Sequence, residues 1–395
     1  MVAGSPTVAG PRARVRVGLV HWALPPTTGG VESHVADLAG SLTDLGCTVT
    51  IFTGERAAAA LPGVEIVYLR HLDVELIRGS PSTSADSTPD CKRALGEAIA
   101  ARRLQVIHGH NLHHFAAAPA LALDELRLRL GFRLHHTFHE TWPDVLHQRP
   151  VYREWDGNYA VSRFVQSECA RYIGFTPRVL LLGVDVDRFR ARRLPMLQSA
   201  QAVILHPARV LPWKGVHVSV EMLALLRQRG IRARLIITDT QRIVDWNEEL
   251  VSYRKHLLAC IQARGLGDSI EFRATRYADM PRLYEEADVV VYPTVGEEPY
   301  GLVPLEAMSM ARPVVGSRSG GMLETIVDGE TGFLVERSDP EALADCVAAL
   351  LRDPERCRRV GRAGRAHVVA HFSARRYAES LLERYLSSGV TEPTA

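Results

Sequence analysis

Twice along its length the chain alternates short apolar runs with longer amphipathic stretches, and this repeated alternation constrains the fold more than any other feature. It is typical of βαβ units, because two parallel strands are joined by a crossover that usually contains a helix. The first series runs from Val15–His21 to Arg178–Leu182, and the second from Ala202–His206 to Gly332–Val335. We therefore predict an α/β fold with two Rossmann-like, doubly wound lobes.

Each series predicts short strands separated by helices. In the first lobe we expect strands at Val15–His21, Thr48–Phe52, Val64–Leu69, Gln105–His110, Arg133–Phe138, Tyr159–Ser162 and Arg178–Leu182. In the second lobe we expect them at Ala202–His206, Ala233–Thr238, Ile270–Phe272, Asp288–Tyr292, Arg312–Gly316 and Gly332–Val335.

The predicted linker between the lobes is Arg190–Ser199, which is basic, contains proline and lacks clear periodicity. It separates a domain of residues 14–190 from one of residues 200–372. A closing helix over residues 373–390 follows, and the sequence leaves open whether this helix packs back on the first lobe.

The length, charge and cysteines of the chain limit the classes of protein to which it can belong. Its 395 residues exceed what one hydrophobic core usually supports. The 47 basic and 45 acidic residues nearly cancel, so we expect no nucleic-acid partner. The six cysteines form no C-x-x-C pair, and no run of about 18 apolar residues occurs. We expect a cytoplasmic protein with no transmembrane segment.

Glycines and cations follow two of the predicted strands, at the sheet edge where ligands of parallel sheets bind. Gly29 and Gly30 open the first helix, where backbone N–H groups and the helix dipole can meet an anion. Such a turn is more often structural than functional. In the second lobe Arg209 and Lys214 share a loop before a helix, and two converging cations suit a diphosphate. The alternative is a pair of solvated surface cations.

The strongest motif is the segment EEPYGLVPLEAM at Glu297–Met308, directly after a predicted strand. Since proline is tolerated in the first turn of a helix, Pro304 indicates a helix that begins near Gly301. Glu298 then lies on the preceding loop, and Glu306 lies inside the helix. Alternatively, Glu298 only caps the helix and Glu306 is solvated. The free N–H groups at the helix start form a second candidate anion site, carried by Gly301, Leu302 and Val303.

Several segments together resemble glycosyltransferase family 4, the retaining glycosyl transferases of group 1. Glu298 and Glu306, with seven residues between them, are similar to the glutamate signature of that family. Gly29–Val35 resembles its N-terminal glycine loop, Arg209–Gly215 its phosphate loop, and Tyr292–Val335 its C-terminal core. The likeness covers most of the chain. It implies the GT-B fold, in which two Rossmann-like lobes enclose an interdomain cleft.

The resemblance further implies that the second lobe binds a nucleotide-sugar donor, that the first binds an acceptor, and that transfer takes place in the cleft. The residues assigned to the donor come from the motifs above: Glu306 for the ribose, Glu298 for the transferred sugar, Arg209 and Lys214 for the diphosphate, and Gly29 and Gly30 for its edge. His139 matches the family histidine that faces the reacting sugar, although a lone histidine is more often a packed strand-end residue. The acceptor stays unidentified; a small molecule, a glycan and a lipid-linked molecule all stay open.

Two positions depart from the family pattern. Leu182 stands where an asparagine usually precedes Gly-Val-Asp, and Thr238-Asp239-Thr240 replaces a glycine-containing turn. Neither change touches the phosphate cations or the paired glutamates, so we expect an active enzyme.

The charges of the motifs predict a reaction without cofactor or metal. Arg209 and Lys214 can neutralise the leaving diphosphate, and no Asp-x-Asp or His-Cys ligand set stands at a suitable place. The histidines of residues 108–114 and 135–139 could suggest a metal site, but no carboxylate or thiolate is spaced to complete one. The arginines between Arg352 and Arg365 are expected on solvated helix faces, although such clusters can also touch anionic lipid at a membrane surface.

The resemblance thus implies a hexosyltransferase that uses a nucleotide-sugar donor. Two other functions stay open. A sugar-nucleotide epimerase or phosphorylase on a similar fold would turn over the donor without the acceptor. A binding-only relative with a dead site would show no acceptor-dependent release of nucleoside diphosphate.

Overall fold

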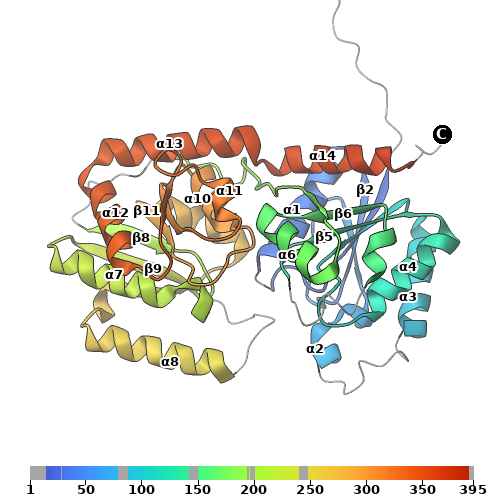
Figure 1. Ribbon diagram of the computed structural model, residues 1–395, viewed down its shortest axis with the longest axis horizontal. Coiled ribbons are helices and arrows are strands. Elements are labelled where there is room, and N and C mark those ends of the chain that lie inside the picture. Colours follow the sequence, from blue (N-terminus) through green and yellow to red (C-terminus); the bar gives the residue numbers. More distant parts are fainter. Residues whose placement is uncertain are drawn as a thin grey trace, which may run out of the picture.

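Two parallel sheets, each covered by helices, form the two lobes of the protein (Figure 1). The structure is a computed structural model, and it describes residues 15–27, 29–78, 88–141, 150–193, 195, 201–239 and 248–390. Every strand pair that joins neighbours within the sheets is parallel. The predicted α/β class and the two doubly wound lobes are therefore confirmed.

The sheet of the first lobe has the order β3-β2-β1-β4-β5-β6-β7. Its strands are β1 (Arg16–Val20), β2 (Thr48–Thr53), β3 (Val64–Tyr68), β4 (Val106–His110), β5 (Arg133–Phe138), β6 (Gly157–Ala160) and β7 (Arg178–Val179). The sheet of the second lobe has the order β10-β9-β8-β11-β12-β13. Its strands are β8 (Ala202–His206), β9 (Ala233–Asp239), β10 (Ile270–Ala274), β11 (Val289–Tyr292), β12 (Val314–Ser317) and β13 (Phe333–Val335).

Helices cover both sheets. Those of the first lobe are α1 (Gly30–Asp44), α2 (Val74–Arg78), α3 (Thr88–Arg102), α4 (Ala118–Leu130) and α6 (Arg163–Ile173). Those of the second lobe are α7 (Val216–Gln228), α8 (Glu248–Ala263), α9 (Met280–Glu286), α10 (Leu302–Ser309), α11 (Met322–Thr325), α12 (Pro340–Arg352) and α13 (Pro354–His371). The chain continues into α14 (Ala374–Ser387), and short 3-10 turns lie at η1 (Arg70–Leu72), η3 (Pro150–Glu154), η4 (Pro212–Lys214), η5 (Gly267–Ser269) and η6 (Tyr277–Asp279).

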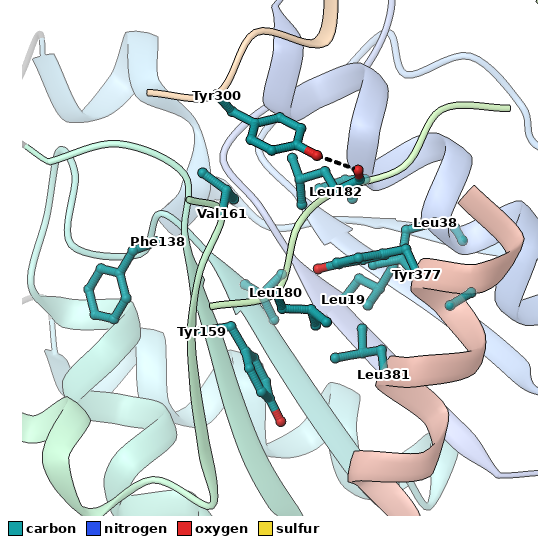
Figure 2. Close-up of a cluster of buried hydrophobic side chains, with 14 of the residues drawn as sticks. Leu19, Leu38, Phe138, Tyr159, Val161, Leu180, Leu182, Tyr300, Tyr377 and Leu381 are labelled. Carbon is teal, nitrogen blue, oxygen red and sulfur yellow. Dashed lines mark hydrogen bonds between the residues drawn. The ribbon is translucent and has the colours of Figure 1, made fainter. Parts of the chain in front are cut away.

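The last helix crosses from the second lobe to the first and packs against α1 (Figure 1). Tyr377 and Leu381 of α14 are buried beside Leu19 of β1 and Leu38 of α1 (Figure 2). Further along the helix, the Tyr385 hydroxyl lies 2.6 Å from Nδ1 of the buried His108. The C-terminal helix is thus part of the core of the first lobe.

Two predicted strands of the first lobe have wrong boundaries. The strand predicted at Tyr159–Ser162 is β6, which ends at Ala160 because the Ser162 side chain accepts a hydrogen bond from Val165 N and caps α6. The strand predicted at Arg178–Leu182 is only two residues long, because β7 pairs with β6 alone and stops where β6 stops. Half of the predicted linker, residue 194 and residues 196–199, lies outside the described residues.

The order of the strands places the site. In each sheet the strand order reverses beside its first strand, between β1 and β4 and between β8 and β11. Ligands of doubly wound sheets bind beyond the carboxyl ends of the strands at such a reversal. Among the described residues, none of the helices combines the length and the apolar composition that a membrane crossing requires.

Candidate functional site

A cavity of about 770 Å³ lies between the lobes, at the carboxyl ends of β1 and β8. Loops after β1, β4 and β5 line it from the first lobe, and loops after β8, β9 and β11 together with the start of α10 line it from the second. All of the residues predicted for the site line this one cavity: Gly29, Gly30, His139, Arg209, Lys214, Glu298, Gly301, Leu302, Val303 and Glu306. The fold therefore gathers residues that are up to 277 positions apart, from Gly29 to Glu306.

Lys214 and Glu298 form a buried ion pair in the wall of the second lobe. The ammonium of Lys214 donates hydrogen bonds to Oε2 of Glu298 at 2.7 Å and to the hydroxyl of Tyr292 at 2.8 Å. The Tyr292 hydroxyl in turn donates to Oε2 of Glu298 at 3.0 Å. Burial lowers the pKa of Lys214, but the charges and hydrogen bonds of Glu298 and Tyr292 together outweigh this effect, so the pKa is raised and the ammonium stays charged.

The short turn that carries Lys214 depends on a glycine. Gly215 follows η4 with a φ of 72°, a left-handed conformation that costs a side-chain-bearing residue energy. A Cβ at this position would also collide with the carbonyl oxygen of Pro293. The backbone of the loop after β11 thus packs directly on the loop that carries Lys214.

Glu306 occupies a drier position, inside α10. This helix begins after Gly301, whose φ of 91° sets the turn, and Glu306 lies on its buried side with an exposed fraction of 7%. The Tyr284 hydroxyl donates a hydrogen bond of 2.7 Å to Oε2 of Glu306. Burial raises the pKa of Glu306 to about 8, against the lowering effect of that hydrogen bond. Without a ligand, Glu306 is therefore mostly protonated at neutral pH.

The start of α1 already holds an anion from its own chain. The carboxylate of Glu32 folds back to where a Cβ on Gly29 would stand, so the absent side chain leaves room for it. Its Oε1 lies 3.7 Å from Nε2 of His21. Burial raises the pKa of Glu32. The hydrogen bond and charge of His21, together with the charge of Arg209, lower it by more than burial raises it, so the net shift is downward. A Cβ on Gly30 would lie 3.6 Å from the side chain of Leu302, so the two lobes approach each other closely here.

His139 lies at the end of β5 and is 5% exposed. Its Nε2 is 2.9 Å from Nδ1 of His110, and its backbone N–H donates to Oδ1 of Asn111 at 2.8 Å. Burial lowers the pKa of His139 well below the usual range, so the imidazole is neutral. Since Nε2 is engaged with His110, the other ring nitrogen is the one left for a ligand.

The fold adds a histidine that spacing did not connect with this pair. Side-chain nitrogens of His34, His110 and His139 lie within 4.8 Å of one another, and all three residues are buried. Among the described residues, this is the one group of histidine, cysteine and acidic side chains close enough to hold a metal ion. His34 comes from α1, and burial lowers its pKa to about 3.

Of the departures from the family pattern, Leu182, Thr238 and Asp239 also lie in the cavity wall, whereas Thr240 lies outside the described residues. Leu182 offers its carbonyl oxygen to the hydroxyl of Tyr300 at 2.6 Å, a contact between the lobes (Figure 2). Asp239 accepts two hydrogen bonds from Arg254, at 2.7 and 2.8 Å, and Thr238 donates to Ala208 O at 3.1 Å. Each departure is thus tied into the protein by its own partner.

Among the residues that escaped prediction are Tyr292 and Glu32, which line the cavity, and Tyr284, which contacts Glu306. Tyr292 ends the strand before the glutamate motif, so its place at a carboxyl end of the sheet could have marked it. Glu32 lies in the first turn of α1, where a carboxylate is favoured by the helix dipole. Tyr284 lies on α9, and nothing in its local sequence indicates contact with Glu306.

Comparison with known proteins gives two family matches that together span both lobes. Residues 28–188 match the model for Glycosyltransferase Family 4, and residues 187–367 match the model for Glycosyl transferases group 1. The chain is 28% identical to D-inositol 3-phosphate glycosyltransferase 2 of Catenulispora acidiphila, over 83% of each chain. It is 29% identical to a GDP-mannose-dependent alpha-(1-6)-phosphatidylinositol monomannoside mannosyltransferase of Mycobacterium tuberculosis, over 90% of this chain and 94% of that one.

A solved structure confirms the fold assignment. A glycosyltransferase from Rickettsia africae superposes with a TM-score of 0.76 over 95% of this chain and 98% of that one, at 20% identity.

Proposed function

The chain belongs to glycosyltransferase family 4, so it is a retaining, nucleotide-sugar-dependent glycosyltransferase with the GT-B fold, and on this premise we propose how its residues divide the work of transfer. The second lobe binds the donor, and the first lobe binds the acceptor. One observation carries the proposal: the buried pair of Lys214 and Glu298 faces the same cavity as Arg209 and His139. Two cations and a carboxylate thus surround the place where a sugar–phosphate bond can lie.

In the proposed reaction an acceptor hydroxyl attacks the anomeric carbon of the donor sugar. The new bond joins the acceptor oxygen to that carbon, and the bond from the carbon to the diphosphate oxygen breaks. Both electrons of the broken bond leave with the diphosphate, and the hydroxyl proton passes to a diphosphate oxygen. Attack from the face that the diphosphate leaves retains the anomeric configuration without a carboxylate nucleophile.

In this proposal, Arg209 and Lys214 lower the activation barrier more than any other residues of the site. Negative charge grows on the diphosphate as the bond breaks, and Arg209 and Lys214 lie ready to stabilise it. Tyr292 and Glu298 hold Lys214 in the cavity wall before the donor arrives, so its ammonium has only to exchange one hydrogen bond. We propose that this fixed positive charge makes a divalent metal dispensable.

The remaining predicted residues position the two substrates. Glu298 meets the transferred sugar, Glu306 binds the ribose, and the helix starts at Gly30 and Gly301 face the phosphates. The neutral imidazole of His139 contacts the sugar beside the reacting carbon. The relatives are named for different acceptors, one an inositol phosphate and one a phosphatidylinositol mannoside, so they do not indicate one acceptor for this chain.

The test is release of nucleoside diphosphate from a panel of nucleotide sugars, with Arg209→Leu compared with Arg232→Leu. Arg232 is exposed in the same lobe and outside the cavity, so it serves as the matched control. We expect turnover to fall about a hundredfold in Arg209→Leu, the scale of one lost transition-state contact, and to stay unchanged in Arg232→Leu. Equal turnover in the two variants would contradict the assignment of Arg209.

A further inference from the structure

The acceptor half of the cavity combines aromatic rings with carboxylates. We propose that the acceptor is a polyhydroxylated molecule that carries a protonated amine, such as an amino sugar or an aminocyclitol. This inference rests on the proposed division of the lobes, in which the first lobe holds the acceptor. It adds the charge and chemical class of the second substrate.

Aromatic side chains form one part of this wall. Trp22, after β1, and Phe115, after β4, meet edge to face with their ring centroids 5.3 Å apart, and both line the cavity. The indole N–H of Trp22 donates to the carbonyl oxygen of Asn111 at 2.8 Å, so its orientation is fixed. Phe164 of α6 adds a third ring to the cavity wall. Aromatic faces attract ammonium groups and also cover the apolar faces of a ring-shaped substrate.

Carboxylates form the other part. Glu140 directly follows His139, the residue proposed to contact the reacting sugar, and its side chain is 40% exposed to the cavity and solvent. Its Oε1 lies 3.8 Å from Nδ1 of His114 and accepts a long hydrogen bond of 3.5 Å from Asn111. Glu168 of α6 also lines the cavity, and its carboxylate forms no hydrogen bond or ion pair with any residue that the structure describes. A carboxylate that lines a cavity in this way is a ready partner for a cation.

The charges of the cavity are distributed by lobe. The second lobe contributes Arg209 and Lys214 together with four acidic residues, and three of these acids are paired with cations: Asp239, Glu297 and Glu298. Among the described residues, the first lobe lines the cavity with Glu32, Glu140 and Glu168 and with no lysine or arginine. The acceptor region is therefore negative. An ammonium group would lower the electrostatic energy of this region, and a phosphate group would raise it.

The first experiment measures which acceptors are used. Release of nucleoside diphosphate above the rate without acceptor, with mass spectrometry of the product, is compared for scyllo-inosamine, scyllo-inositol and inositol 3-phosphate, and for glucosamine, glucose and glucosamine 6-phosphate. We expect kcat/KM for each amine to exceed that of its neutral counterpart at least about tenfold, which is the effect of one lost charged contact. Preference for the neutral or the phosphorylated compounds, or use of no amine at all, would overturn the proposal.

The second experiment tests the two carboxylates directly. In Glu140→Gln and Glu168→Gln, KM for the amine acceptor should rise about tenfold, while KM for the donor and the slow hydrolysis of the donor stay unchanged. With the neutral acceptor, KM should not change. In Glu168→Asp, which keeps a carboxylate, KM for the amine acceptor should stay near the wild-type value. Glu97→Gln, on the exposed side of α3 and away from the cavity, serves as the control.

The outcomes separate this inference from the proposed function. If the variants change KM equally for amine and neutral acceptors, the acceptor class is wrong, although transfer itself stands. If the wild-type protein neither hydrolyses nor transfers any donor sugar, the proposed function fails first.

Discussion

Glu306 lies in a place where a charged carboxylate is costly, so its substitution should make the ligand-free protein more stable. Burial raises the pKa of Glu306 from 4.5 to about 8. Between these two values the folded protein keeps a proton on Glu306 that the unfolded chain loses, so stability falls as the pH rises. One pKa unit corresponds to about 1.4 kcal/mol, which gives a loss of about 3 kcal/mol at pH 7 and about 4 kcal/mol at pH 8, where half of the folded molecules have also lost the proton.

Glu306→Gln keeps the shape of the side chain and an oxygen that can accept from Tyr284, but it cannot ionise. We expect the variant and the wild type to be equally stable at pH 4.5, where the contribution of Glu306 is not yet lost. The variant should be more stable by up to about 3 kcal/mol at pH 7, a rise of several degrees in the unfolding midpoint. Thermal and urea unfolding of the ligand-free protein at pH 4.5, 7.0 and 8.5 measure the difference. Glu330→Gln, an exposed glutamate of the same lobe, should show no such trend.

The same substitution should weaken nucleotide binding. If Glu306 binds the ribose hydroxyls as a carboxylate, binding at pH 7 must release its proton, and this proton release should be missing in Glu306→Gln. Calorimetry of nucleoside diphosphate in buffers of different ionisation enthalpy measures the released protons. A variant that is no more stable than the wild type at pH 8.5, or that binds nucleotide as tightly, would refute the reasoning.

Three further results are expected from the proposed roles. Glu298→Gln should leave the affinity for nucleoside diphosphate nearly unchanged and reduce turnover about a hundredfold in steady-state kinetics, because the transferred sugar changes in the reaction and the nucleotide does not; loss of nucleotide affinity with full turnover would reverse the assignment of the two glutamates. Transfer should continue in excess chelator, since Arg209 and Lys214 carry the leaving-group charge, and rescue of a chelated enzyme by magnesium or manganese would count against this. Solution scattering should report closure of the lobes on saturation with nucleoside diphosphate, and an unchanged profile would indicate a rigid cleft.

The fold could be predicted from sequence because each lobe repeats one local pattern. Residues in the middle of β-branched runs, such as Val49 and Val290, are buried on both faces of a parallel sheet and therefore form unbroken apolar segments. Strand ends were harder to predict at the edge of the sheet. There, the hydroxyl of Ser162 ends β6 by capping a helix, and apolar content alone does not reveal that change of role.

The site could be predicted only where its residues lie near one another in the sequence or beside a strand end. Glu298 and Glu306 share a motif, and Arg209 and Lys214 share a loop, so their chemistry was visible in the sequence. The partners that set their charge states come from elsewhere in the chain. Tyr284, which donates to Glu306, lies 22 positions earlier and on another helix. A helix-to-helix contact of this kind depends on packing that no local spacing encodes.

The charges of Lys214 and Glu298 are complementary to the charges that develop in the proposed reaction. As the sugar–phosphate bond breaks, the anomeric carbon becomes positive and the diphosphate more negative. Lys214 can then move its hydrogen bond from Glu298 to the diphosphate, and the carboxylate that it leaves faces the positive sugar. Before the reaction each of these charges is neutralised by the other at 2.7 Å, so the ligand-free protein is spared the cost of burying either one alone. Lys214 and Glu298 gain by separating only when opposite charges appear on the substrate. They therefore stabilise the transition state more than the bound substrate. Such an interaction raises turnover rather than affinity.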